Sequence, residues 1–338
     1  MIHGSLMVFL NLCIMLLIIL IAAEIFTNAL EYLGQKLKIS EGVTGSIFAA
    51  VGTALPETSV PIIALLFPSG SIETSHDIGV GSILGAPLML STIALGLIGL
   101  FSFYKRGISG HFVVEQTGIK RDLDFFLVAF IFAGLALYIP HTDIFVRNLI
   151  GALMVFIYFF YIFKTIRASK KLVEAGHGTD AEHPMLLNRI GLPVNSFTIV
   201  LQLFIGLALL IFGAKGFVSQ VEVVASYIGI SVLVLSIMIV PIATELPEKV
   251  NSILWIRRRK DTLAFGNITG AMVFQGTLLP ALGIILTPWE PKNEITLLFF
   301  ITILSVIWIR TIIHFGALKV WHVFISGSLY FAYLFLIF

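Results

Sequence analysis

The chain has 338 residues, of which 58% are hydrophobic and only 12% are charged, and its formal net charge is +2. Roughly a quarter of the residues of a soluble globular protein are charged, so this composition excludes an ordinary soluble domain. The single cysteine, Cys13, excludes an internal disulfide.

Apolar stretches recur along the whole chain, and about twenty helical residues span the hydrocarbon core of a bilayer. Helices are predicted rather than a membrane barrel, because barrel strands alternate polar and apolar residues. The predicted transmembrane helices, ten in number, cover residues 5–28, 42–66, 78–103, 123–139, 145–164, 197–218, 228–256, 263–287, 294–313 and 317–337.

The basic residues indicate the orientation of these spans. Most of the 21 Lys and Arg residues lie after the first, third, fifth, seventh and ninth spans, as Arg257–Lys260 does. Cytoplasmic loops carry this excess, so both termini are predicted to face away from the cytoplasm, in a plasma or inner membrane. The run 257–260 is interpreted as a positive anchor, although contact with anionic lipid would have the same composition.

Two sequence strings occur twice. Residues 52–57 read GTALPE and residues 243–248 read ATELPE, while GSILGA at 81–86 is matched by GNITGA at 266–271. We therefore predict an all-α membrane protein of about ten transmembrane helices in two five-helix repeats, 1–165 and 197–338, joined by a cytoplasmic linker at 166–196. An odd number of spans in each repeat gives the two copies inverted topology.

Both duplicated strings place a glutamate inside a span. Glu57 and Glu248 lie roughly 15 Å from the nearer helix end, about half of a 30 Å hydrocarbon core. A carboxylate at that depth needs a partner inside the bundle, and a cation is the obvious one. Lys249 follows Glu248 directly, but adjacent helical residues do not face each other, which leaves the acid available.

Further oxygen ligands surround these acids. Proline has no N–H, so each Leu-Pro-Glu string frees the carbonyl four residues before its proline. A threonine precedes each glutamate by four residues, on the same helical face. Ca²⁺ takes six to eight such hard oxygens. The predicted ligands are Glu57, Glu248, Glu245, Thr53, Thr244, Ser82, Asn267 and the carbonyls of Gly52 and Ala243.

Several of these residues have a structural alternative. The threonine hydroxyls can bond back to the preceding turn, and small polar residues such as Ser82 and Asn267 can hold helices together. Glu245 can be a third ligand, a proton carrier or an acid paired within the bundle. Four glycines of the second pair of strings are predicted to allow close helix approach, namely Gly81, Gly85, Gly266 and Gly270.

At these residues the sequence resembles the calcium/cation antiporter superfamily, which includes the sodium/calcium exchangers. Residues 52–57 are similar to its first repeat motif, GTSxPE, and 243–248 to the second, while 266–270 resemble its GNxxGS stretch. The resemblance implies two inverted five-helix halves whose glutamates and threonines coordinate Ca²⁺ and counter-ions. Ala54 stands where the family has serine, and GSIL at 81–84 looks like the corresponding segment of proton/calcium exchangers, so the coupling ion stays open between Na⁺ and H⁺.

Two other polar groups are interpreted differently. Glu24, Asn28 and Glu31 share a face near the cytoplasmic end of the first span, where interfacial solvation is expected rather than a place in the site. The 166–196 segment contains a set of metal-ligating residue types, but it has no fixed ligand spacing, and a solvated linker is expected rather than a regulatory metal site. That set is His177, Asp180, Glu182 and His183.

The leading hypothesis is a secondary antiporter that exchanges Ca²⁺ for Na⁺ or H⁺ by alternating access at a two-glutamate site. The alternatives are a cation channel, or an antiporter without preference for Ca²⁺. The sequence has no GxxxxGK[ST] and no HExxH, so neither an ATP-driven pump nor an intramembrane zinc enzyme is predicted. We expect no cofactor, with the transported cations and the bilayer as partners, and no nucleic acid or obligate protein partner.

Overall fold

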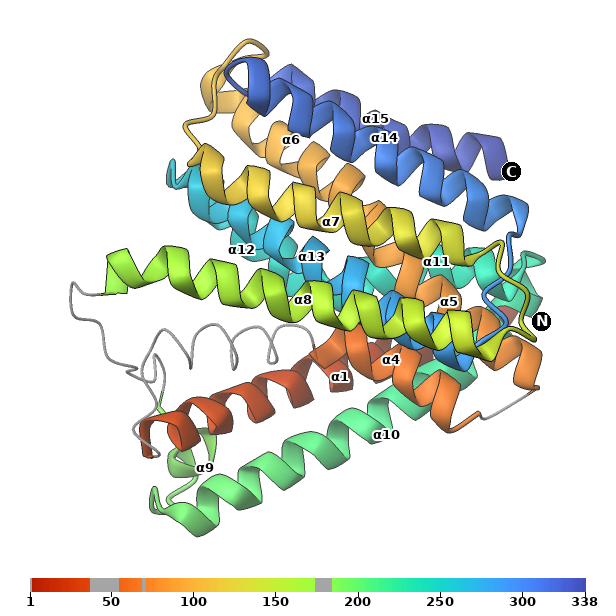
Figure 1. Cartoon of the computed structure of the whole chain (residues 1–338). Coiled ribbons are helices and arrows are strands. Elements are labelled where there is room, and N and C mark those ends of the chain that lie inside the picture. Colours follow the sequence, from red (N-terminus) through yellow and green to blue (C-terminus); the bar gives the residue numbers. More distant parts are fainter. Residues whose placement is uncertain (1, 37–54, 69–70, 174–183) are drawn as a thin grey trace. The chain divides into compact units, whose positions relative to one another are not determined.

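The structure, a computed structural model, describes residues 2–36, 55–68, 71–173 and 184–338 (Figure 1). Within these residues the regular structure is helical, apart from an isolated bridge between His111 and Lys319. Seven of the described helical segments are long and apolar enough to cross a membrane, and two shorter apolar ones accompany them, Glu57–Leu66 and Val232–Ile242. The prediction of an all-helical membrane protein is thereby confirmed.

The chain divides into two compact units. The first contains Met1–Ile78 and Ile162–Val232, and the second contains Gly79–Tyr161 and Leu233–Phe338. Each unit therefore takes segments from both predicted repeats. The repeats are a property of the sequence, and their inverted relationship stays a prediction.

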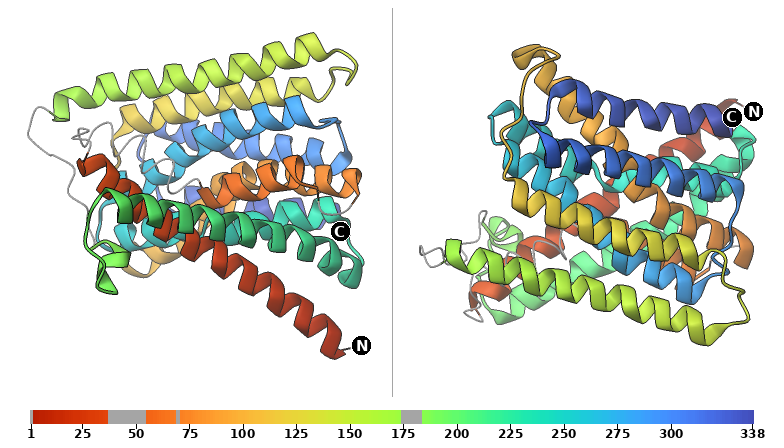
Figure 2. Two further views of the ribbon diagram at one scale, coloured as in Figure 1. Left: turned by 90° about the horizontal axis from the view of Figure 1, so that it is seen from below. Right: turned by 45° about the horizontal axis from the view of Figure 1, so that its top comes forward.

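The first unit is organised by two long helices that pack against each other. Its described helices are α1 (Ile2–Lys36), α4 (Leu55–Leu66), α9 (Leu186–Arg189) and α10 (Ser196–Ile228). Figure 2 shows α1 and α10 crossing, and α10 also contacts α4. A Cβ built at Gly206 or Gly213 would lie 2.9 to 3.0 Å from atoms of Phe26 or Ile19 on α1. Small residues thus allow the close approach that stabilises helix pairs in lipid.

Asn28 of α1 corrects one expectation from the sequence. Instead of being solvated at the interface, its side chain is buried. Its Oδ1 accepts hydrogen bonds from the backbone N–H of Leu186 (3.0 Å) and from Nε2 of Gln202 (2.9 Å). Asn28 therefore ties α9 and α10 to α1, while Glu24 is exposed as expected. The residues His177, Asp180, Glu182 and His183 lie outside the described residues.

The remaining described helices lie wholly or partly in the second unit. They are α5 (Ile72–Met89), the π-helical turn η2 (Leu90–Ala94), α6 (Leu95–Arg106), α7 (Gln116–Ala136), α8 (Ile144–Val173), α11 (Val232–Thr244), α12 (Leu246–Arg257), α13 (Asp261–Leu286), α14 (Asn293–Phe315) and α15 (Val320–Ile337). Helices α5, α8 and α11 extend into the first unit by part of their length.

Aromatic stacking and one buried arginine hold this unit together. Phe126 and Phe130 of α7 stack at 4.9 Å, and Phe130 stacks on Phe299 of α14 at 4.4 Å. The buried guanidinium of Arg147 in α8 donates to the carbonyls of Ile284, Thr287 and Pro288 at the end of α13. These carbonyls have no partner inside their own helix, so Arg147 acts as a cap supplied by another helix.

The π-helical turn η2 interrupts the long helix from Ile72 to Arg106. Such a turn disturbs the regular bonding of the backbone, and here the carbonyl of Ser91 accepts a hydrogen bond from Oγ of Ser305 on α14 at 2.6 Å. Just beyond it, a Cβ at Gly96 would lie 2.9 Å from Cα of Gly327. Helices α6 and α15 therefore meet backbone to backbone at this point, side by side at the top of Figure 1.

The loops at one end of the second unit are joined by backbone and charged contacts. Phe112 donates its N–H to the carbonyl of Leu318. Arg106 donates to both carboxylate oxygens of Asp261 at 2.6 Å, and the same carboxylate accepts from the N–H of Val113. Glu115 caps α7. Burial raises the pKa of Glu115, but hydrogen bonds from the N–H groups of Gly118 and Thr117 outweigh this and hold the pKa below its usual value.

Candidate cation site

The second Leu-Pro-Glu string lies at an interruption between two helices. Helix α11 ends at Thr244, Glu245 has φ −93° and ψ 14°, and α12 begins at Leu246 with a proline in its first turn. The missing N–H of proline is harmless at that position, because the first turn of a helix has no internal acceptor for it. The break predicted for this span is therefore present, and Ala243 lies in the last turn of α11.

The first string occupies the corresponding position in α4. The described part of α4 starts at Leu55, and α12 starts at Leu246, so in both helices the glutamate directly follows the proline of the string. Glu57 is only 4% exposed and Glu248 only 3%. The two acids are thus buried at equivalent helical positions, one in each unit. Gly52 and Thr53 lie outside the described residues, and their proposed role stays a prediction.

Asn267 of α13 holds the backbone at Glu248. Its Nδ2 donates to the carbonyl of Glu248 at 3.0 Å and to Oγ of Ser252 at 3.1 Å. Both amide hydrogens are used in these bonds, so only the carbonyl oxygen of Asn267 can act as a ligand. Asn267 therefore holds two helices together and also lies beside the acid, as both interpretations of the sequence predicted. Ser252 is a residue that the sequence reasoning missed.

Thr244 shows the back-bonding alternative. Its buried hydroxyl donates to the carbonyl of Val240 at 3.0 Å, one turn earlier in α11. A hydroxyl that donates its hydrogen keeps its oxygen lone pairs, which are the groups that a cation binds. Ser82 in the matching string of α5 is buried as well.

Lys249 is the partner of Glu245, not of Glu248. Its Nζ lies 3.3 Å from Oε2 of Glu245, and both side chains are buried, at 6% and 0% exposure. The four-residue spacing of an acid and a lysine was visible in the sequence and predicts such a pair. The sequence reasoning considered Lys249 only against its direct neighbour.

The predicted close approach of glycines holds for one pair and not for the other. A Cβ at Gly81 would lie 2.7 Å from Cβ of Ser236, and at Gly85 one would clash with the carbonyl of Ile237, so α5 and α11 are in backbone contact. At Gly266 a Cβ would meet no described atom within 4 Å, and at Gly270 only the hydroxyl of Tyr161 at 3.9 Å. The expectation for Gly266 and Gly270 was therefore wrong in the described part of the chain.

A second buried acid in this unit has complete partners. Asp122 of α7 accepts hydrogen bonds from Oγ1 of Thr269 (2.8 Å) and from the hydroxyl of Tyr161 (3.1 Å), and lies 3.4 Å from Arg121. Thr269 belongs to the GNITGA string, so this string also joins α13 to α7 and α8. We interpret Asp122 as structural, since its oxygens are occupied by these donors.

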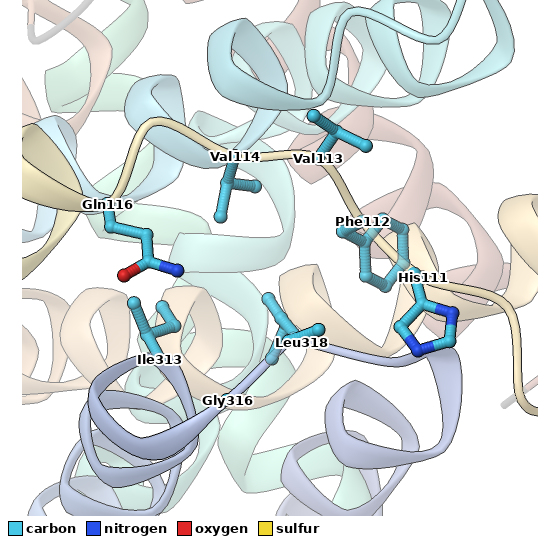
Figure 3. A pocket seen from close by; sticks show the side chains of 9 residues that line it. His111, Phe112, Val113, Val114, Gln116, Ile313, Gly316 and Leu318 are labelled. Atoms are coloured by element: carbon cyan, nitrogen blue, oxygen red, sulfur yellow. The ribbon is translucent and has the colours of Figure 1, made fainter.

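The pocket in Figure 3 is not a cation site. It has a volume of about 270 Å³ and lies between the loop around His111, with Gln116 at the start of α7, and the α14–α15 loop around Leu318. No carboxylate lines it. Among the residues that the structure describes, no three His, Cys, Asp or Glu side chains gather in one group. A cation bound within these residues therefore needs hydroxyl and carbonyl oxygens as well as acids.

Buried acids inside the helices of an integral membrane protein define a class, the ion transporters. The sequence profile of the family described as "Sodium/calcium exchanger protein" matches residues 7–167 and 198–338. The chain belongs to this family, and the resemblance seen in its duplicated strings is confirmed. Its members are exchangers, so the protein is a membrane cation antiporter and not an enzyme.

Individual relatives agree with this membership. The inner membrane protein YrbG of Escherichia coli (strain K12) is 27% identical over 280 residues, which cover 81% of this chain and 78% of YrbG. The fold is similar to the crystal structure of an H⁺/Ca²⁺ exchanger, CAX, with a TM-score of 0.68, 15% identity and coverage of 98% and 82%. It is also similar to the sodium-calcium exchanger NCX_Mj, with a TM-score of 0.58, 18% identity and coverage of 99% and 98%.

Proposed function

We propose that this antiporter exchanges Ca²⁺ for Na⁺ or H⁺, and that Glu57 and Glu248 are the acids that bind the transported ions. The observation that carries the proposal is their equivalence: two duplicated strings each place a buried glutamate directly after a proline within a helix. A carboxylate buried inside a membrane protein is costly, so two at matched positions of duplicated strings are best explained by a role in binding charge.

The chemistry of the surrounding groups favours Ca²⁺ over softer metals. Carboxylate, hydroxyl and carbonyl oxygens are hard ligands that suit Ca²⁺. In the second copy Thr244, Asn267 and the interrupted backbone at Ala243 supply such oxygens. In the first copy Gly52, Thr53 and Ser82 are the corresponding proposed donors. The names of both structural neighbours include Ca²⁺ as an exchanged ion.

Exchange requires that the site open to one side of the membrane at a time. We propose that the two repeats have inverted topology, with ten spans and both termini outside the cytoplasm, because inverted repeats allow two pseudo-symmetric states to alternate. Helix breaks such as the one at Glu245 are the usual place for ion ligands in these folds, since backbone without helical bonds is tolerated only where it lines a cavity or is covered by protein.

Calcium uptake into sealed proteoliposomes under imposed gradients tests this function. An antiporter accumulates Ca²⁺ when Na⁺ or H⁺ is more concentrated inside than outside, and the ion that drives uptake is the coupling ion. Choline replaces Na⁺ in the matched control, with the membrane potential clamped. Uptake that follows the membrane potential without either gradient would instead indicate a channel and contradict the proposal.

A further inference from the structure

The two copies of the Leu-Pro-Glu string differ at two positions that carry charge. Where the first copy has Ala54 and Thr58, the second has Glu245 and Lys249. The acid and the base therefore occur together in one copy and are both missing from the other. Glu245 and Lys249 form an ion pair, so their charges cancel. Residues 52–58 and residues 243–249 therefore each have a net charge of −1.

The ammonium of Lys249 is bound as a small cation would be. Besides Oε2 of Glu245 at 3.3 Å, its Nζ lies 3.0 Å from the carbonyl oxygen of Pro241 and 3.0 Å from Sδ of Met89. The ammonium donates hydrogen bonds to the Pro241 carbonyl and to Sδ of Met89, and Oε2 of Glu245 lies within ion-pair distance. All four residues belong to the second unit, so the arrangement lies within one compact body.

The surroundings of this pair contain further oxygens with no hydrogen-bond donor. Gln275 of α13 and Tyr330 of α15 both interact with Glu245. The Oε1 atom of Gln275 and the hydroxyl of Tyr330 are buried, and neither has a hydrogen-bond partner among the described residues. A buried polar group without a partner is costly. Carboxylate, carbonyl, amide and hydroxyl oxygens of this kind are hard ligands that suit a monovalent cation.

We propose that Lys249 is a tethered cation, whose ammonium occupies at Glu245 a position that a dissolved monovalent cation would otherwise fill. This inference rests on the proposed function, because it concerns the charges available to the transported ions. With Glu245 neutralised from within the chain, two net negative charges remain for cargo, those of Glu57 and Glu248. Removing the ammonium creates a new cation site and adds one monovalent cation to the bound set.

The direct test replaces Lys249 by the first-copy residue. We expect the stability of Lys249→Thr to depend on small monovalent cations. When about 100 mM NaCl, KCl or LiCl replaces choline chloride, the Tm of this variant in detergent is expected to rise by about 4 °C more than the Tm of the wild type. Wild type and variants are measured at the same alkaline pH. The double variant Glu245→Ala/Lys249→Thr has the same first-copy residues without the acid, and its Tm is expected to respond as the wild type does.

The same cation dependence in Lys249→Thr and in wild type would overturn the inference. A second variant keeps the test decisive where Lys249→Thr is too unstable to purify. Glu245→Gln leaves the ammonium without its carboxylate and close to Glu248, so equilibrium Ca²⁺ binding is expected to weaken about tenfold, and Glu245→Gln/Lys249→Met to recover it. Unchanged Ca²⁺ affinity in Glu245→Gln would contradict the tethered cation.

These outcomes separate the inference from the proposed function. A wild-type protein that binds no Ca²⁺ defeats the assignment of Ca²⁺ as cargo. The difference in Tm between Lys249→Thr and the double variant does not depend on Ca²⁺, so it still decides whether the ammonium takes the place of a dissolved cation.

Discussion

The segments around Glu57 and Glu248 share the string Leu-Pro-Glu, yet their surroundings differ. In the second copy the carbonyl of Glu248 accepts a hydrogen bond from Asn267, and an ion pair between Glu245 and Lys249 flanks the acid on both sides in sequence. In the first copy the equivalent of Glu245 is Ala54. Both copies therefore have a buried acid at the same place in the string, whereas the residues around that acid differ.

The largest expected effect comes from the shared element of the two segments. Glu57→Gln and Glu248→Gln keep the shape of the side chain but remove its charge, so each is expected to lower Ca²⁺ uptake by about 100-fold or more, equivalent to about 2.7 kcal/mol of lost ion binding. Uptake is measured in proteoliposomes, with Tm as the check on folding. The exposed Glu73→Gln is the matched control, and wild-type flux in either variant would remove that acid from the site.

A second difference between the copies concerns the glycines of GSILGA and GNITGA. A Cβ at Gly85 would clash with the carbonyl of Ile237, whereas at Gly270 it would meet only the hydroxyl of Tyr161 at 3.9 Å. Gly85→Ala is therefore expected to lower the free energy of unfolding by about 1–3 kcal/mol. Gly270→Ala is expected to raise it by about 0.5–1 kcal/mol, because alanine favours helix.

Thermal denaturation of the two glycine variants checks this pair, with the wild type measured in parallel. Equal shifts in Tm at the two positions would show that α5 and α11 are not in the close contact seen here.

Asn267 contacts only the second copy, and a smaller effect on Ca²⁺ binding is expected from its removal. Asn267→Ala removes the bonds to the backbone carbonyl of Glu248 and to the hydroxyl of Ser252, so we expect the affinity for Ca²⁺ to fall about tenfold, or about 1.4 kcal/mol. A positioning role predicts this loss in equilibrium binding together with largely retained maximal uptake. Asn188→Ala, on an exposed asparagine, serves as control, and an unchanged dissociation constant for Asn267→Ala would refute the role.

The smallest effect lies outside both copies, at the cap of α7. Glu115→Ala is expected to lower the free energy of unfolding by at most about 1 kcal/mol at neutral pH. The pKa of Glu115 is lower in the folded state, so its contribution is present above the pKa of the unfolded chain and is lost as the pH falls through the folded pKa. Urea unfolding at neutral and acidic pH measures this, and a difference that persists in acid would contradict it.

Much of the architecture could be predicted from sequence because it follows from hydrophobicity alone. Apolar length identified the helices, and duplicated Gly, Pro and Glu residues identified the two buried acids. The break at Glu245 was also predictable, since Pro247 cannot donate to the carbonyl four residues before it. The segment from 37 to 54, which contains Thr53, lies outside the described residues, so that part of the predicted site stays a prediction.

What sequence reasoning missed are contacts between distant segments. No local pattern shows that Asn28 of α1 accepts from Gln202 of α10, or that Asn267 reaches the backbone at Glu248. The lack of a close described neighbour at Gly266 was unpredictable for the same reason, since a glycine permits close approach but does not require it. The Lys249–Glu245 pair was predictable from its four-residue spacing, and attention to the adjacent Glu248 obscured it.

The central claim is that Ca²⁺ and the coupling ion use the same two acids. Equilibrium Ca²⁺ binding to the purified wild-type protein, titrated with Na⁺ and separately with H⁺, tests it most directly. The coupling ion is expected to displace Ca²⁺ competitively. It then shifts the apparent dissociation constant for Ca²⁺ without changing the number of Ca²⁺ sites. Ca²⁺ binding that is unaffected by either ion, or that persists at wild-type affinity in Glu57→Gln and Glu248→Gln, would contradict it.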